Sequence, residues 1–325
     1  MTNLSRREAL AAGAGAALSL LANPAFAQAL TEMKILVPAA PGGGWDQTGR
    51  VMQGVLIGQK IVRSAQVTNV AGAGGTIGIA QFVNGFKGDP TGIMVSGFVM
   101  VGAILMNKAP VTLDAVTPIA RLTGEWQALV VAQNSPIKTV QDLVAAVKTD
   151  VAKVSWGGGS AGGVDHITAA MFAGKAGADG SKVNYIAHSG GGEALAAILS
   201  GRVTVGVGGA SEFDQHVKGR RMRWLGLTAP AGTAGLPGPT LTEQGFDLQL
   251  QNWRGLFAGP GLSTEQIAAI GEVVKQMVKS PSWAEQLAAK GWQDTYLDRE
   301  PFAEFVKAEV QRVDGVLREL GLVKA

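Results

Sequence analysis

The junction that decides the fold lies at residues 33–46, which read MKILVPAAPGGGWD. Residues 33–37 are almost wholly apolar, which predicts a buried strand that ends at Pro38. Three consecutive glycines, Gly42 to Gly44, then precede a stretch with apolar residues at helical spacing. A strand, a glycine turn and a helix in this order form the unit from which parallel α/β sheets are built.

Short apolar segments alternate with helical patterns along the rest of the chain. We expect further strands at residues 66–70, 93–96, 129–131, 154–156, 183–186, 203–205 and 224–227. This alternation predicts an α/β fold with mostly parallel sheets and helices on both faces. Capping boxes at residues 139–142 and 263–266 predict two helix starts, and a last helix should begin near Asp298. A chain of 325 residues exceeds what one core usually supports, so we expect two domains.

The composition excludes several classes of protein. Cysteine is absent, which excludes disulfides, thiolate metal sites, cysteine nucleophiles and attachment of a lipid through cysteine. The three histidines, His166, His188 and His216, lie too far apart in sequence for a zinc site built on one helical turn. The net charge of +3 comes from scattered basic residues, so nothing indicates binding to nucleic acid. We therefore expect no metal ion and no nucleic acid as a partner.

The N-terminus has the features of an export signal. Arg6 and Arg7 precede an uncharged segment, residues 9–22, that is too short to span a bilayer. Residues 25–27 then supply the small-x-small pattern of a signal peptidase site. The sequence around the two arginines also resembles the twin-arginine export motif. We expect a signal peptide over residues 1–27, cleavage after Ala27 and a periplasmic mature protein.

Glycine is concentrated in loops that follow strands and precede helices. It makes up 46 of the 325 residues, roughly twice the usual ~7%. Triplets occur at residues 42–44, 157–159 and 190–192, and residues 71–76 form a fourth loop of this kind. Ligands of α/β sheets bind at the carboxyl ends of strands, where helix N-termini offer free N–H groups and partial positive charge. Four such loops predict an anion site that needs neither lysine nor arginine.

Several residues in or beside these loops have two roles open to them. Asp46 suits an N-cap that shapes the first loop, or a contact to a ligand through water. Trp45 could form a wall of a cleft or simply pack. His166, at a helix start, could donate a hydrogen bond to a ligand or to the other domain, or it could be a capping or surface residue.

A nucleotide site and a hydrolase are the other readings of these loops. Residues 157–162 match GxGxxG, but the next strand ends in His188 and Ser189 rather than in the acid that binds ribose, so we expect no nucleotide cofactor. A secreted serine hydrolase would use Ser160 or Ser189. Ser189 lacks the GxSxG elbow. Asp165 and His166 are adjacent on one helix and point in different directions, so they do not form a catalytic triad with a serine. A binding site without catalysis is therefore favoured, with the hydrolase as the alternative.

Together these loops resemble those of the substrate-binding proteins of tripartite tricarboxylate transporters, the Bug-type family. The resemblance is carried by residues 37–46, 67–78, 155–163 with Asp165 and His166, and 252–255. It implies a two-lobed, type II-like periplasmic binding protein fold with a ligand cleft between the lobes. Lobe 1 would comprise residues 28–128 and 248–325, and lobe 2 would comprise residues 129–247.

The resemblance also implies a function. The protein would be a monomeric extracytoplasmic receptor without cofactor or catalysis, which captures a small carboxylate and delivers it to membrane permease subunits; a receptor that feeds a sensor kinase is the alternative. Residues 45–48, WDQT, look like the tricarboxylate-binding branch, which implies a citrate-like ligand. The sequence does not place Arg121 or Arg254 in the cleft. The implied ligand-binding residues are Ala39, Ala40, Gly42, Gly43, Gly44, Trp45, Asp46, Gly74, Gly75, Thr76, Gly158, Gly159, Ser160, Ala161 and Gly162, with His166, Ser189 and Gly190 as additions.

Overall fold

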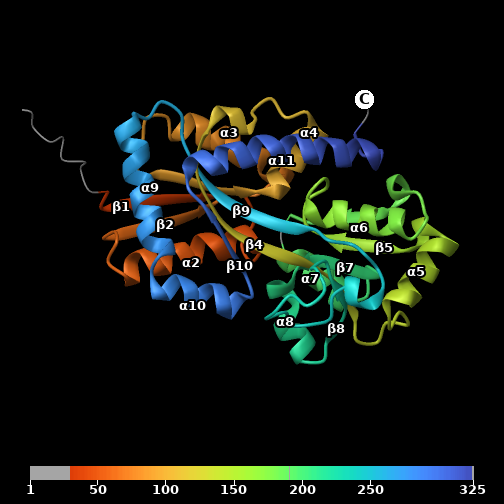
Figure 1. The fold of residues 1–325 in the computed structure, drawn as a ribbon. Helices are drawn as coiled ribbons and strands as arrows, with labels where there is room; N and C mark the ends of the chain where they lie inside the picture. The colour runs from red at the N-terminus through yellow and green to blue at the C-terminus, as the bar shows by residue number, and fades with distance from the viewer. Residues whose placement is uncertain (1–29, 190, 324–325) are drawn as a thin grey trace, which may run out of the picture.

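The computed structural model describes residues 30–189 and 191–323 of the protein. Ten strands form one sheet in the order β2-β1-β3-β9-β4-β7-β5-β6, and β8 and β10 both pair with β4 beside this path. Figure 1 shows two groups of helices, one around each half of the sheet, joined at the centre by the long strands β4 and β9. The predicted signal peptide, residues 1–27, and Gly190 lie outside the described residues.

The first half of the sheet is built from parallel strands. β1 lies between β2 and β3, with Ile35 opposite both Val67 and Ile93. The glycine turns connect these strands to helices, as the sequence predicted. The elements are β1 (Glu32–Val37), α2 (Gly44–Gly58), β2 (Ser64–Asn69), α3 (Thr76–Gly85), β3 (Gly92–Gly97) and α4 (Phe98–Asn107).

The second half repeats this construction. β5 pairs in parallel with both β6 and β7. The predicted capping box at Thr139 and Asp142 starts the first of its helices and is confirmed. The elements are α5 (Val140–Thr149), β5 (Ser155–Gly158), α6 (Val164–Lys175), β6 (Asn184–Ala187), α7 (Gly191–Leu199), β7 (Val205–Gly209), α8 (Ala210–Lys218) and β8 (Met222–Leu227).

Two strands cross from one half to the other, and both are antiparallel to their neighbours. β4 (Thr117–Ala132) pairs with β9 (Gln251–Ala258) and β10 (Gln293–Leu297), and then with β7 and β8. β9 also pairs antiparallel with β3. The sheet is therefore mixed, which corrects the expectation of mostly parallel sheets. Only residues 129–131 of β4 were predicted as strand, because charged residues interrupt the apolar pattern upstream.

The C-terminal helices α9 (Thr264–Val278), α10 (Pro281–Lys290) and α11 (Arg299–Glu319) complete the first half. The predicted capping box at Ser263 and Gln266 and the predicted start after Asp298 are both confirmed. Short 3-10 turns connect other elements: η1 (Ala73–Gly75), η2 (Leu113–Ala115), η3 (Val151–Lys153), η4 (Gly180–Lys182) and η5 (Thr242–Gln244). Within residues 30–189 and 191–323, no helix has both the length and the apolar character needed to cross a membrane.

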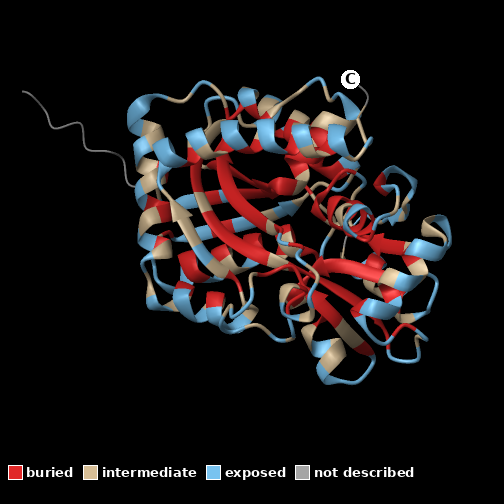
Figure 2. Ribbon diagram, turned by 45° about the vertical axis from the view of Figure 1, so that its right-hand side comes forward, coloured by how far each residue is buried: buried red, intermediate tan, exposed pale blue. Residues whose placement is uncertain are grey.

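The hydrophobic clusters follow the division into halves. The largest cluster joins residues 33–122 with residues 250–317, and takes Val164 and Ile167 from the second half. Two further clusters draw their buried members from residues 128–248. Figure 2 shows the buried strands at the centre of each half and the exposed outer faces of the helices. The chain thus has separate cores on either side of the crossing strands.

Candidate ligand-binding site

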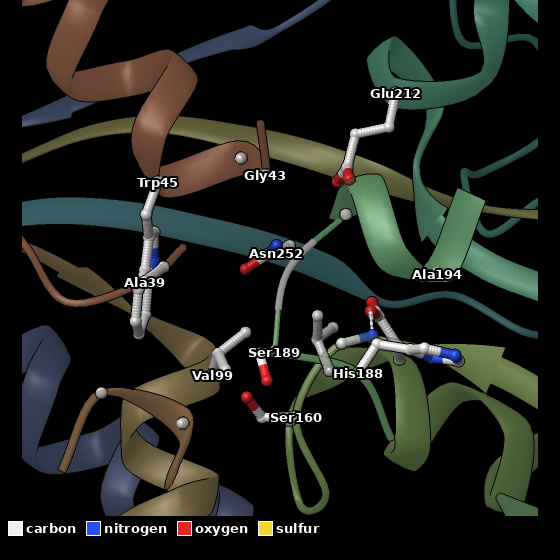
Figure 3. Close-up of a pocket in the computed structure, with 18 of the residues that line it drawn as sticks. Ala39, Gly43, Trp45, Val99, Ser160, His188, Ser189, Ala194, Glu212 and Asn252 are labelled. Carbon is white, nitrogen blue, oxygen red and sulfur yellow. Dashed lines mark hydrogen bonds between the residues drawn. The ribbon is translucent and has the colours of Figure 1, made fainter. Parts of the chain in front are cut away.

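A cavity lies where the glycine loops of the two halves meet (Figure 3). Its wall includes the loop after β1, the η1 turn, the loop after β5 and the turn between β6 and α7, together with residues of β9 and α8. The space between the lining atoms is about 850 Å³, including the part open to solvent. The four loops singled out in the sequence therefore lie around one cavity.

Half of the predicted ligand-binding residues line this cavity. They are Ala39, Gly43, Gly44, Trp45, Gly74, Gly75, Gly159, Ser160 and Ser189. Eight others do not line it: Ala40, Gly42, Asp46, Thr76, Gly158, Ala161, Gly162 and His166. Gly190 falls outside the described residues. Those that lie outside the lining have other contacts, which explain their positions.

Asp46 shapes the first loop from within the helix. The N-cap of α2 is Gly43, and no side chain caps this helix within the described chain, so the predicted N-cap role of Asp46 is wrong. The Asp46 carboxylate instead accepts hydrogen bonds from Gly42 N at 3.0 Å, Arg50 Nε at 3.0 Å and Asn69 Nδ2 at 2.9 Å. Burial alone would raise the pKa of Asp46, but these hydrogen bonds and the charge of Arg50 hold it below its usual value. The carboxylate is thus occupied, while the first turn of α2 faces the cavity uncapped.

The η1 turn reaches the cavity because its backbone is left-handed over successive residues. Ala73, Gly74 and Gly75 have φ angles of 45°, 64° and 94°. A Cβ on Gly75 would lie 2.9 Å from the Trp45 ring, and one on Gly74 would lie 3.4 Å from Cβ of Ser160. Both glycines therefore let the backbone approach the other loops closely. Trp45, 6% exposed, fills both roles open to it: it packs against this turn and also lines the cavity.

His166 holds the loop of the second half rather than pointing into the cavity. Its Nδ1 accepts a hydrogen bond from Gly162 N at 3.1 Å, and its ring stacks on Tyr185 with a centroid distance of 4.4 Å. Burial lowers the pKa of His166 to about 4, so the ring is neutral at neutral pH. Tyr185 Oη donates a hydrogen bond to Gly159 O at 2.9 Å, which fixes the same loop. The N-cap of α6 is Gly163, and no side chain among the described residues caps it, so His166, like Asp46, shapes its loop from the third residue of the helix rather than as an N-cap.

Gly158 and Gly162 allow close packing. A Cβ on Gly162, which has a φ angle of 75°, would collide with Met106 of α4. A Cβ on Gly102 of α4 would in turn collide with the carbonyl oxygen of Gly162. Gly158 faces the Tyr185 hydroxyl inside the sheet. These glycines are needed where the two halves and the strands approach each other, which sequence alone does not distinguish from access to a ligand.

The chain matches the family model described as the tripartite tricarboxylate transporter family receptor over residues 50–322. It belongs to this family. The protein is similar to BugT of Bordetella pertussis, with 26% identity over 297 residues and 89% of each chain covered. The structure of the periplasmic binding protein BugD has a TM-score of 0.81 at 19% identity, covering 90% of this chain and 99% of BugD. MatC from Rhodopseudomonas palustris, solved with bound malate, has a TM-score of 0.77 at 21% identity, covering 88% of this chain and 98% of MatC.

These similarities confirm the predicted family and the predicted α/β periplasmic binding protein-like fold. Members of this receptor family are periplasmic binding proteins that serve transport and are not enzymes, so the alternative of a serine hydrolase is contradicted. The geometry agrees, since His166 is bonded to Gly162 and no described hydrogen bond joins it to Ser160 or Ser189. The two serines line the cavity of a receptor.

The receptor has a buried cation directly behind its first loop. Arg254 on β9 is 0% exposed, lines the cavity and pairs with Glu125 on β4. A Cβ on Gly44 would collide with the Arg254 guanidinium, so the cation lies against the start of α2. Its Cζ also lies 4.9 Å from the centre of the Trp292 ring, and its Nε and Nη1 have no hydrogen-bond partner within the described chain. The guanidinium therefore lies beside the start of α2, with its charge balanced by Glu125.

The other arginine left open by the sequence lies elsewhere. Arg121 donates from Nη2 to Gln251 Oε1 at 2.9 Å, and its guanidinium lies 4.4 Å from the centre of the Phe305 ring. It does not line the cavity. Arg254 is therefore the arginine that the fold brings to the site.

Two carboxyl groups of the second half also line the receptor's cavity, and the sequence analysis assigned neither to the site. Asp165 on α6 accepts from Gly159 N at 2.8 Å, and Glu212 on α8 accepts from Gly209 N at 3.4 Å. Burial raises the pKa of Glu212 to about 8, and the charges of Glu125 and Asp165 add to the shift. Burial likewise raises the pKa of Asp165 to about 6 against the hydrogen bond from Gly159. At neutral pH Glu212 is therefore mostly protonated.

Asn252 and His188 are the remaining polar lining residues that the prediction missed. Asn252 on β9 is 8% exposed, and its Oδ1 has no partner within the described chain. His188 donates from Nδ1 to Gly158 O at 3.0 Å. Asn252 lies in the segment 252–255 that carried the family resemblance, which was the signal available for it. The position of Glu212, in an ordinary amphipathic helix, carried no such signal.

Proposed function

We propose that the protein captures a small carboxylate in this cavity and delivers it to the membrane permease of a tripartite transporter. The observation that carries the proposal is the convergence of four glycine loops on one cavity, with the buried cation of Arg254 behind the first loop. Backbone N–H groups and helix N-termini only donate hydrogen bonds, and a carboxylate only accepts them. The group that best satisfies such a cavity is an anion with several acceptor oxygens.

The proposal includes capture by closure of two lobes. Lobe 1 comprises residues 28–128 and 248–325, and lobe 2 comprises residues 129–247. The separate hydrophobic clusters of the two halves support this division. The contact between Gly102 of α4 and Gly162 supports a closed arrangement, because it joins the two lobes beside the cavity. Closure around a ligand is a common motion of two-lobed receptors.

The charges around the cavity bear on which carboxylate is bound. The first loop, with Trp45 and Asp46, resembles the tricarboxylate-binding branch and supports a citrate-like ligand. Against this, Glu125 already neutralises Arg254, and Asp165 and Glu212 also lie at the wall. A third ligand carboxylate would be tolerated only with these acids protonated. MatC, a fold relative, holds the dicarboxylate malate. We propose that dicarboxylates and citrate both be considered, with the affinity order decided by experiment.

Isothermal titration calorimetry of the mature protein tests this function. The panel comprises malate, succinate, citrate, tricarballylate and glutamate, with the neutral diamide of succinic acid as the matched control. We expect binding of at least one acid and none of the diamide, because the cavity is built for acceptor oxygens with negative charge. No heat from any acid would refute the proposal.

Export and processing are also part of the proposal. We propose that residues 1–27 are a twin-arginine-type signal peptide and that the periplasmic protein begins at Gln28. Sequencing the N-terminus of the protein recovered from the periplasm tests this. A start other than Gln28 would contradict the cleavage site, and retention in the cytoplasm would contradict export.

A further inference from the structure

Glu212 occupies a place in the cavity that its charge makes unusual. Its carboxyl group enters the cavity from α8, on the side opposite Trp45 and Ala39 (Figure 3). A Cβ on Gly191 would collide with Glu212 Oε2 and would lie 3.3 Å from Cα of Gly43. The carboxyl group therefore sits where the first loop meets the start of α7. A ligand anion bound at the uncapped start of α2 would therefore lie beside this carboxyl group.

The charged groups that act on Glu212 come from several elements. Glu125 on β4 accepts hydrogen bonds from the backbone and side chain of Ser211, the neighbour of Glu212 in the chain. Asp165 on α6 and Arg254 on β9 complete the cluster. Nearby, the Glu193 carboxylate of α7 accepts a hydrogen bond from Ser189 N at 3.0 Å, and His188 Nδ1 donates to Gly158 O. Arg254 pairs with Glu125, and no salt bridge to Glu212 occurs among the described residues.

An ionised Glu212 has little to stabilise it in this cluster. Its one hydrogen bond among the described residues, from Gly209 N, is 3.4 Å long. Two further acids lie within electrostatic range, and the only nearby cation among the described residues already has a carboxylate partner. A carboxyl group in such surroundings keeps its proton. The arrival of an anionic ligand strengthens this preference, because it adds another negative charge.

We propose that Glu212 binds the ligand in its protonated form, donating a hydrogen bond to a ligand carboxylate, so that the receptor must take up a proton with its ligand wherever Glu212 is ionised in the free receptor. The inference rests on the proposed function, namely that the cavity holds a carboxylate. The neutral carboxyl group supplies an O–H donor, and an O–H donor to a carboxylate makes a short, charge-assisted hydrogen bond. When Glu212 is ionised in the free receptor, binding consumes one proton from solvent and one ligand anion. No other reactant is needed.

The coupling between ligand binding and protonation of Glu212 predicts how affinity depends on pH. Since the pKa of Glu212 in the free receptor is about 8, its titration should leave affinity unchanged well below this pH, where Asp165, with a pKa of about 6, is the group of the cluster that titrates. Above it, the dissociation constant should rise up to about tenfold per pH unit, with nearly one proton taken up per ligand at about pH 9. The ligand itself contributes little to the change above about pH 8, because all carboxyl groups of malate and citrate are ionised there.

Calorimetry with malate and citrate as probes tests the inference, between about pH 6 and pH 9 in pairs of buffers that differ in ionisation enthalpy. The variant Glu212→Gln keeps a hydrogen-bond donor but cannot titrate. We expect it to bind with a pH-independent affinity and without proton uptake. The control is Asp214→Asn on the same helix, whose carboxylate pairs with Lys218 outside the cavity and should leave the wild-type pH profile unchanged. Thermal unfolding of each variant verifies that it is folded.

The outcomes separate the inference from the function on which it rests. A wild-type affinity that stays constant to about pH 9 would overturn the inference and leave carboxylate binding intact. So would a Glu212→Gln variant that keeps the wild-type pH dependence, since the proton would then reside elsewhere. Failure of wild-type protein to bind any acid of the panel at any pH would overturn the proposed function and this inference with it.

Discussion

Replacing Gly44 by alanine tests the position of the buried cation, and with it the electrostatics of the site. Gly44 is the first residue of α2 and does not have a positive φ angle, so alanine fits the backbone there. The added Cβ would collide with Nη2 of Arg254 and lie 2.8 Å from its Cζ. An exposed guanidinium would swing away at little cost. Arg254 is held between Glu125 and the Trp292 ring, so relief of the collision requires loss of the ion pair.

The magnitude follows from these contacts. Breaking a buried ion pair costs about 3–5 kcal/mol, and alanine in a helix returns at most about 1 kcal/mol relative to glycine. We expect Gly44→Ala to lower the free energy of unfolding by about 2–4 kcal/mol, a large fraction of the stability of a typical domain. Affinity for a carboxylate should fall as well, because the cation moves away from the first loop.

The assay is urea unfolding together with calorimetry of ligand binding, with Gly54→Ala as the matched control. Gly54 lies on the exposed face of the same helix, and a Cβ there meets nothing within 4 Å. This variant should be more stable than wild type by about 0.5–1 kcal/mol and should bind unchanged. If Gly44→Ala is as stable as Gly54→Ala, the guanidinium does not lie against the start of α2, and the account of Arg254 given above is refuted.

Three further predictions concern the loop and the buried titratable groups. Gly43→Val should lower affinity at least tenfold with the fold intact, because its side chain enters the cavity. The control Gly43→Ala, whose Cβ would lie 3.4 Å from Gly191 N, should bind nearly normally. Equal affinity of the two variants would contradict the assignment of this cavity as the binding site. The stability of wild type relative to Glu212→Gln should fall as pH rises from about 4.5 to 8, by up to about 1.4 kcal/mol per pH unit, and then level off, because the folded state keeps the proton that the unfolded chain releases. His166 acts in the opposite direction: with its pKa at about 4 when folded, wild type should lose stability as pH falls from about 6.5 to 4, and His166→Gln, which keeps an acceptor for Gly162 N, should lose this component in pH-dependent thermal unfolding. A stability difference between wild type and either variant that does not change with pH would refute the corresponding assignment.

The parts of the fold that could be predicted depend on local patterns. The strand at residues 33–37 was recognised from its apolar run, and the helix starts at Thr139 and Ser263 from their capping boxes. Within each half, the meeting of the glycine loops followed from topology, because parallel strands end at one edge of a sheet. These features need no knowledge of distant contacts, and the structure agrees with each of them.

The glycines show where local patterns stop being sufficient. Gly43 lines the cavity, Gly44 leaves room for Arg254, and Gly162 leaves room for α4. All three stand in glycine-rich loops between a strand and a helix, so the sequence treats them alike. What separates them is the neighbour that a Cβ would meet, and that neighbour lies in another part of the chain.

Most of β4 and all of β9 were missed as strands for a reason that bears on function. Glu125 in β4 is 1% exposed, and Arg254 in β9 is 0% exposed. Arg254 lies opposite Thr123, two residues from Glu125, so both charges point from the same face of the sheet. These charges break the apolar alternation by which strands are recognised. A buried charge is costly unless it is paired, and a pair is rarely worth more than an apolar contact of similar volume. Stability alone therefore does not explain the Arg254–Glu125 pair in the crossing strands. We infer that the pair serves ligand binding, because it places Arg254 behind the first loop. Burial separates this charge from Arg121, which also interrupts β4 but is not fully buried and does not line the cavity, so the arginine of the segment 252–255 is recognised as part of the site only in the folded structure.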